Sequence, residues 1–209
     1  MQNHFETPEE IQAQIYKELA RATHDRHHAW RTPVLATSTL DGMPNARTVV
    51  LRKFIPAAIN ANSRTTDDHT GGTLEIYTDR RSPKVTEWQQ QPEACLVFWS
   101  ARLSWQLRVK VSVSIQTEGS YVESLWQTVK QTRAAGDYLG LLAPGETLVA
   151  DSEYGESASA SNESDPQFAV LSARIKEIDW LELGRGQHRR ARMGSLGNNT
   201  GWGWAWLQP

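Results

Sequence analysis

The chain has 209 residues, of which 39% are hydrophobic and 22% are charged, and its formal net charge is −2. This length suits one domain over residues 1–209, and the nearly balanced charge gives no reason to expect nucleic acid or a membrane as the main partner. No apolar run approaches the roughly 20 residues of a spanning helix, and the polar, acidic N-terminus is unlike a signal peptide. These features favour a cytoplasmic protein.

The first predicted element is a helix within residues 1–30. Thr7 is suited to cap it, and the acidic residues that follow suit its positive end. Apolar side chains then recur at helical spacing, at Ile11, Ile15, Leu19 and Ala22. Three histidines come next, His24, His27 and His28. No carboxylate or cysteine pattern completes a metal site around them, so we expect no metal and solvated histidines.

From residue 33 the pattern is typical of strands. The predicted strands cover residues 34–40, 45–54, 73–78, 94–99 and 103–117. Asp41-Gly42 predicts a hairpin between the first two, residues 56–72 an exposed loop, and Ser82 the cap of a short helix that reaches about residue 91. The strand over residues 103–117 alternates most clearly, with apolar side chains on one face and Gln106, Arg108 and Lys110 on the other.

The remainder of the chain contains one more helix and three more strands. We expect the helix at residues 120–133, strands at 168–183 and 187–193, and a last strand that ends at the C-terminus. The acidic, serine-rich segment 151–166 is predicted to be a mobile surface loop. Many strands and few helices indicate a mainly β protein with flanking helices, built as an antiparallel barrel.

Basic residues inside the predicted strands are the most unusual feature. Arg47 and Arg52 bracket an apolar segment, Lys84 lies at a helix start, and residues 188–192 alternate in charge. Such side chains usually point outward into water. The alternative is that some of them converge on a phosphate, where arginine offers a bidentate fork and a helix start adds N–H groups. No glycine-rich phosphate loop, zinc spacing or Gly-x-Ser-x-Gly motif is present.

These basic residues belong to a larger pattern. Arg47-Thr48-Val49-Val50-Leu51-Arg52, followed by Tyr77-Thr78, Ser82-x-Lys84 and Gln106, resembles the FMN-binding signature of pyridoxamine 5′-phosphate oxidase. The terminal Trp-Leu-Gln-Pro resembles the Leu-x-Pro with which those enzymes end. The resemblance spans roughly residues 30–117 and 168–209. It implies an FMN-binding split β-barrel of the broad oxidase-related subgroup rather than the oxidase itself.

The resemblance also implies roles for individual residues. Arg47 and Lys84 would hold the FMN phosphate, and Gln106 and Arg192 would lie near the flavin ring, acting across the interface of a homodimer. The other implied cofactor-binding residues lie along the ring, and they are Thr48, Val49, Val50, Leu51, Arg52, Tyr77 and Thr78. The cofactor would occupy a cleft between two subunits, where the protein tunes its redox chemistry.

Departures from the oxidase pattern concern the substrate. Pro83 replaces a second basic residue beside Lys84, and either Arg80 or Arg81 compensates for it or the phosphate is bound more weakly. The C-terminal His188 and Arg190 occur in reversed order. Where the oxidase grips the substrate phosphate with Tyr, Arg and Ser, this chain has Val129, Arg133 and Asp137, and a carboxylate repels phosphate. We therefore expect a different substrate, with Arg52, Arg133 and His188 as substrate-side candidates and catalytic residues unassigned.

Three functions are open at this point. The leading hypothesis is an FMN-dependent oxidoreductase with a small-molecule electron donor or acceptor, and an authentic pyridoxamine 5′-phosphate oxidase is less favoured. A second is a non-catalytic protein that carries FMN or another flat cofactor. A third makes the basic segment 185–192 a site for an anionic polymer. Trp99 and Trp105 suit either the core or a flavin wall, and Trp202, Trp204 and Trp206 are candidates to cover the dimer interface or the cofactor cleft.

Overall fold

The computed structural model describes residues 7–57, 71–147, 165–184, 186–195 and 202–209. Most of the expected loops at 56–72 and 151–166, and also Arg185, lie outside the described residues. In the described part of the chain, every helix is too short or too polar to pass through a membrane.

The described strands form one nine-stranded sheet in which each pairing is antiparallel. Its strands are β1 Val34–Ser38, β2 Pro44–Thr48, β3 Leu51–Ile55, β4 Thr73–Asp79, β5 Glu93–Ser100, β6 Trp105–Gln116, β7 Phe168–Glu182, β8 Arg189–Ser195 and β9 Trp202–Leu207. The mainly β, antiparallel architecture that the sequence predicts is therefore confirmed.

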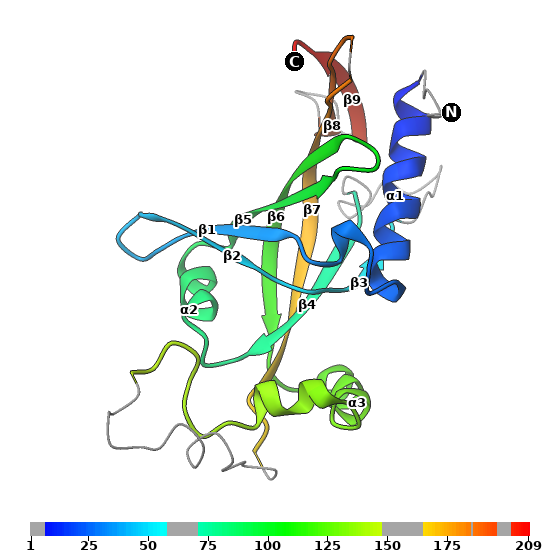
Figure 1. Ribbon diagram of the computed structural model, residues 1–209. Helices are drawn as coiled ribbons and strands as arrows, with labels where there is room; N and C mark the ends of the chain where they lie inside the picture. Colours follow the sequence, from blue (N-terminus) through cyan, green and yellow to red (C-terminus); the bar gives the residue numbers. More distant parts are fainter. Residues whose placement is uncertain (1–6, 58–70, 148–164, 185, 196–201) are drawn as a thin grey trace.

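The two outermost strands of the sheet are joined by a short corner of the chain, and one long inner strand pairs with a different neighbour along each half of its length. Its main path runs β2-β1-β5-β6-β7-β4-β3, and only Val49 and Val50 separate β2 from β3, so one corner of the chain joins the two ends of the path. The long strand β7 pairs with β4 through its first half and with β8 through its second half. Figure 1 shows β8 and β9 extending away from the barrel along this second half of β7.

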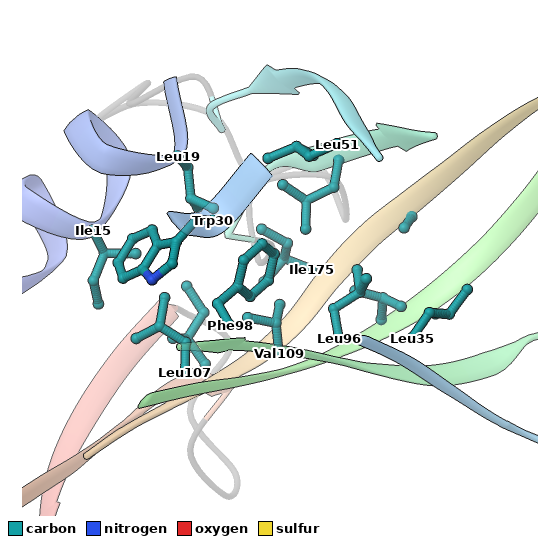
Figure 2. Packing of buried hydrophobic residues seen from close by; sticks show 14 of the residues in the cluster. Ile15, Leu19, Trp30, Leu35, Leu51, Leu96, Phe98, Leu107, Val109 and Ile175 are labelled. Carbon is teal, nitrogen blue, oxygen red and sulfur yellow. The ribbon is translucent and has the colours of Figure 1, made fainter. Parts of the chain in front are cut away.

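Helix α1, Pro8–His24, lies against the barrel and completes its core. Thr7 caps it in a reciprocal capping box with Glu10, as its residue type predicts. The predicted apolar stripe is fully buried, and Figure 2 shows Ile15 and Leu19 beside Trp30 and the core of the barrel. Trp30 contacts Phe98 edge to face, with ring centroids 5.9 Å apart.

The remaining helices are short. Helix α2, Pro83–Gln90, follows β4, and α3, Ser120–Val129, precedes a 3-10 segment at Arg133–Tyr138. The predicted helix over 120–133 therefore ends early, at Val129. The predicted strand over 45–54 is interrupted at Val49 and Val50, where the chain turns. Before the turn it pairs with β1 as strand β2, and after the turn it pairs with β4 as strand β3.

One side-chain expectation is wrong, and the contacts of the last strand within the chain are now defined. His28 is not solvated: its ring is 7% exposed and its Nε2 lies 2.7 Å from Glu18, because the chain folds back along α1 after residue 24. Trp202 and Trp204 pack against the chain's own core, and the indole of Trp204 donates a hydrogen bond to Glu9 of α1. The last strand thus contacts the start of α1, and whether these tryptophans also face a second subunit or the cofactor stays a prediction.

Candidate functional site

Arg47 on β2 is held by a cluster of polar side chains. Its guanidinium donates hydrogen bonds to the Thr37 hydroxyl on β1 and, at 3.0 Å, to the carboxylate of Glu87 on α2. Glu87 also accepts from Thr37 at 2.7 Å and from Asn45 at 3.0 Å. Burial alone would raise the pKa of Glu87, but these donors and Arg47 outweigh it and lower the pKa. The carboxylate is therefore ionised beside Arg47.

Lys84 lies in the first turn of α2, beside the same cluster. Its Nζ donates to the Ser82 hydroxyl at 2.7 Å, and Ser82 makes no side-chain cap to the helix N–H groups. Burial, and then the positive charge of Arg47, lower the pKa of Lys84. The structure thus brings together the two cations that the sequence motif separates by 37 positions (84 minus 47).

Arg52 on β3 lies in a second cluster. Its guanidinium carbon is 5.6 Å from the centroid of the Tyr77 ring, it also interacts with Tyr138, and its buried Nε meets no acceptor among the described residues. Burial, with help from Glu75, raises the pKa of Tyr77 to about 12, so its hydroxyl stays protonated. Of the other motif residues, Val49, Leu51 and Thr78 are buried, Val50 is half-buried and Thr48 is exposed.

Gln106 and Arg192 lie on the opposite face of the sheet from Arg47. Arg47 pairs with Leu35, whose side chain is in the core, and directly paired residues share a face. On β6 the buried neighbours of Gln106 are Trp105 and Leu107, so Gln106 points outward. Arg192 points outward for the same reason, because Ala191 and Met193 on either side of it are fully buried.

The outward face carries a cavity of about 600 Å³ beside Arg192. Its charged lining residues are Arg108, Lys110, Arg190, Arg192, Glu93, Glu177 and Asp179. Asp179 pairs with Arg108 at 2.5 Å and with Arg190 at 2.7 Å, and these arginines lower its pKa against the effect of burial. Because most of these cations have acidic partners, the cavity is not strongly positive.

The substrate-side candidates are not brought together within one chain. Arg52 lies beside Tyr77, exposed Arg133 begins the 3-10 segment after α3, and exposed His188 precedes β8 next to a second cavity of about 590 Å³. Figure 1 shows α3 and β8 at opposite ends of the molecule. In the basic segment 185–192, Arg189 pairs with Glu182 and Arg190 with Asp179. These pairs argue against an open anionic-polymer site.

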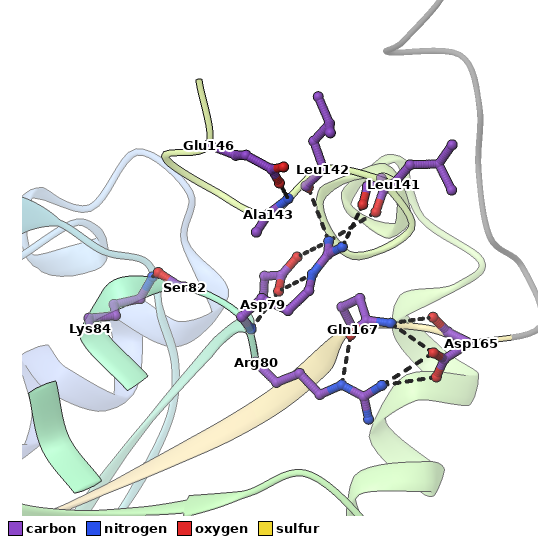
Figure 3. A network of polar contacts seen from close by, with 12 residues as sticks. Asp79, Arg80, Ser82, Lys84, Leu141, Leu142, Ala143, Glu146, Asp165 and Gln167 are labelled. Carbon is purple, nitrogen blue, oxygen red and sulfur yellow. Dashed lines mark hydrogen bonds and ion pairs between the residues drawn. The ribbon is translucent and has the colours of Figure 1, made fainter. Parts of the chain in front are cut away.

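Neither arginine proposed to replace a basic residue at Pro83 reaches Lys84. The Arg81 guanidinium binds both oxygens of Asp79 and the carbonyls of residues 140–142. Arg80 binds Asp165 and Gln167 instead, and Figure 3 shows its side chain directed toward these partners and away from Lys84. Their local acceptors therefore occupy them.

The sequence motif does not include the residues that hold Arg47, which are Thr37, Asn45 and Glu87. The available signal was an acidic residue three positions after Lys84, on the same side of a short helix. No group of three potential metal ligands lies together in the part of the chain that the structure describes.

Comparison with known proteins places this geometry in a family. Residues 12–117, about half of the chain, match the model of the family described as pyridoxamine 5′-phosphate oxidase, FMN-binding domain. The chain is 31% identical over 145 residues to the pyridoxine/pyridoxamine 5′-phosphate oxidase of Thermosynechococcus vestitus, which covers 69% of this chain and 52% of that protein. It is 35% identical over 89 residues to the Trichormus variabilis enzyme, covering 42% and 35%. The chain spans about half the length, or less, of these curated relatives.

Solved structures share the whole fold. PhzG from Burkholderia lata 383, in complex with tetrahydrophenazine-1-carboxylic acid, matches with a TM-score of 0.70 and 20% identity over 100% of both chains. A pyridoxamine 5′-phosphate oxidase-related, FMN-binding protein from Nostoc punctiforme matches with a TM-score of 0.68 and 20% identity, over 99% of this chain and 100% of that one. The chain therefore belongs to the FMN-binding family of pyridoxamine 5′-phosphate oxidase, and its cofactor is FMN.

Proposed function

We propose that the chain is an FMN-dependent oxidoreductase that works as a homodimer and binds the FMN phosphate between Arg47 and Lys84. The observation that carries this proposal is that Arg47 on β2 binds Glu87 of α2 at 3.0 Å, one helical turn from Lys84 on the same helix. Burial and the charge of Arg47 lower the pKa of Lys84 accordingly. Two neighbouring cations repel each other, and a phosphate dianion between them would turn that repulsion into attraction. The donor set therefore fits the phosphate of FMN.

The ring side of the proposed site is the corner between β2 and β3 together with the adjoining end of β4. The backbone of residues 48–52 leaves β2 here, and Tyr77 and Thr78 follow on β4. Arg52 has a buried Nε that lacks an acceptor among the described residues, which suits a polar group of the cofactor or substrate. These residues would orient the flavin and exclude water from one side of it.

The arrangement of the faces supports a dimer. Gln106 and Arg192 point away from the face that carries Arg47, so one flavin can meet all three only when two chains contribute to the site. Dimers with two-fold symmetry would form two such sites, each from the inner face of one chain and the outer face of the other.

The chemistry would come from the cofactor and its positioning. FMN, when bound, takes up a hydride or electrons from a donor, so no side chain has to act as a nucleophile. Exposed Asp137 lies close in sequence to Arg133 and disfavours a phosphorylated substrate. We therefore assign the protein a small-molecule donor or acceptor other than pyridoxamine phosphate, with Arg52, Arg133 and His188 on the substrate side. A cytoplasmic location stays a prediction.

A non-catalytic FMN-binding protein is the second candidate. It is favoured by the ion pair of Arg190 with Asp179, which leaves this arginine less available to a substrate. It is also favoured by the positions of Arg133 after α3 and His188 before β8, because Figure 1 shows α3 and β8 at opposite ends of the molecule.

Reduction of the bound flavin under anaerobic conditions separates the two functions. The FMN-loaded protein would be mixed with NADH, NADPH, pyridoxamine phosphate or a reduced aromatic acid of the kind bound by PhzG, and the flavin absorbance followed. The oxidoreductase proposal expects bleaching by one of them other than pyridoxamine phosphate, and reoxidation by air. The variant Asp137→Ser is a matched probe of substrate choice and should increase the rate with pyridoxamine phosphate. A flavin that no donor reduces would favour the non-catalytic candidate.

A further inference from the structure

We propose that Glu87 is a positioning residue, which orients the guanidinium of Arg47 and fixes its place beside Lys84 for binding the FMN phosphate. The inference rests on the phosphate site proposed above. Glu87 is 5% exposed and binds Arg47 at 3.0 Å, and it lies one helical turn after Lys84 on α2. It would act on the cofactor only through Arg47.

A carboxylate at this place is unfavourable by charge alone. Glu87 and a bound phosphate have the same sign and would repel each other, and burying the carboxylate is unfavourable as well. Three donors, on Thr37, Asn45 and Arg47, compensate for this burial. A simple charge argument therefore predicts that the phosphate would bind more tightly without Glu87, and a role for Glu87 has to lie in geometry.

The contacts of Glu87 supply that geometry. Thr37 is on β1, and Asn45 and Arg47 are on β2, so one carboxylate ties the β1–β2 hairpin to the helix that carries Lys84. The two proposed phosphate ligands come from different elements, and this tie fixes their separation. An arginine side chain loses rotamer freedom when it is ordered, and Glu87 orders it before the ligand arrives.

Binding of FMN compared with binding of riboflavin tests the inference, because the two ligands differ only in the phosphate. The readout is the ratio of the riboflavin Kd to the FMN Kd, measured by flavin fluorescence on the full chain. The positioning role predicts that Glu87→Gln lowers this ratio about tenfold, which corresponds to about 1.4 kcal/mol, while the riboflavin Kd changes less than about twofold. An unchanged ratio, or a higher ratio as the charge argument predicts, would overturn the inference.

Two further variants separate this result from a general loss of folding. Glu18→Gln is the matched control, because Glu18 is also a buried helical carboxylate bound to an arginine, and it should lower stability without changing the ratio. If Glu87→Gln does not fold, Thr37→Val breaks the same cluster from β1 and should lower the ratio about threefold. An unchanged ratio in that variant would then count against the inference.

A double variant tests whether Glu87 affects phosphate binding only through Arg47. Adding Glu87→Gln to Arg47→Ala should lower the ratio no further than Arg47→Ala does alone. If Arg47→Ala leaves the ratio unchanged, the proposed phosphate site itself is wrong. If Arg47→Ala lowers it and Glu87→Gln does not, only the positioning role is wrong.

Discussion

Complementation between two defective variants tests the proposed division of the FMN site between two chains. Arg47→Ala removes a ligand on the inner face, and Arg192→Ala removes one on the outer face. A charged hydrogen bond contributes about 1.5–3 kcal/mol, so each variant should bind FMN roughly 10-fold to 150-fold more weakly than the natural chain. Neither variant would be saturated with FMN at the lowest concentration that saturates the natural chain.

Mixing the two variants should restore part of the binding. When equal amounts are unfolded and refolded together, about half of the dimers contain one chain of each kind. Each such dimer has one site with both natural residues and one with neither, so about a quarter of all sites should bind FMN with natural affinity. The assay is the amount of FMN retained per chain after desalting, with dimer formation checked by sedimentation.

The matched control is a mixture of Arg47→Ala with Lys84→Ala. Both residues belong to the same polar cluster of one chain, in which Arg47 binds the helix that carries Lys84, so no mixed dimer contains an intact site and no binding should return. If Arg47→Ala and Arg192→Ala also restore nothing although mixed dimers form, both residues act within one chain. If the protein is a monomer, the account of the opposite faces is wrong.

Three other predictions concern stability and pH. Glu18→Gln should lower the free energy of unfolding by about 2 kcal/mol at pH 7, because the carboxylate is 1% exposed and bound to His28. Burial alone would raise the pKa of Glu18, but its hydrogen bonds outweigh burial and lower it, so the difference in unfolding free energy between the natural chain and the variant should disappear as pH falls below about 4. Denaturant titrations that show the same difference at every pH would refute this reasoning. Trp30→Ala should lower the free energy of unfolding by about 3–5 kcal/mol because the ring is fully buried, and a change under 1 kcal/mol on thermal denaturation would contradict the packing. FMN affinity should fall as pH rises through the depressed pKa of Lys84, with a proton taken up on binding, whereas Lys84→Arg should show no such fall in a fluorescence titration.

Local patterns in the sequence predicted the elements well. The capping residue Thr7 and the apolar stripe after it gave helix α1, and the alternation in β6 predicted which of its side chains are buried. The turn at Val49 and Val50 was missed, because two apolar β-branched residues continue the strand pattern and no glycine or proline marks the corner.

The site was predictable only through its resemblance to a family. The contacts that hold it join residues distant in sequence: Arg47 binds Glu87 across 40 positions, and Arg108 binds Asp179 across 71. Periodicity reports which face a side chain occupies and not which partner it meets there. For the same reason Arg81 was a reasonable substitute for the residue at Pro83 until its bonds to Asp79 and the nearby carbonyls were known.

The most direct test of the central claim is an absorbance spectrum of the purified protein after incubation with FMN and desalting, recorded beside the same experiment on Arg47→Ala. The account predicts that the visible bands of oxidised flavin remain with the natural chain, at one flavin per chain, and are lost from the variant. A protein that keeps no flavin, or an Arg47→Ala variant that keeps as much as the natural chain, would contradict the proposal that Arg47 and Lys84 hold the FMN phosphate.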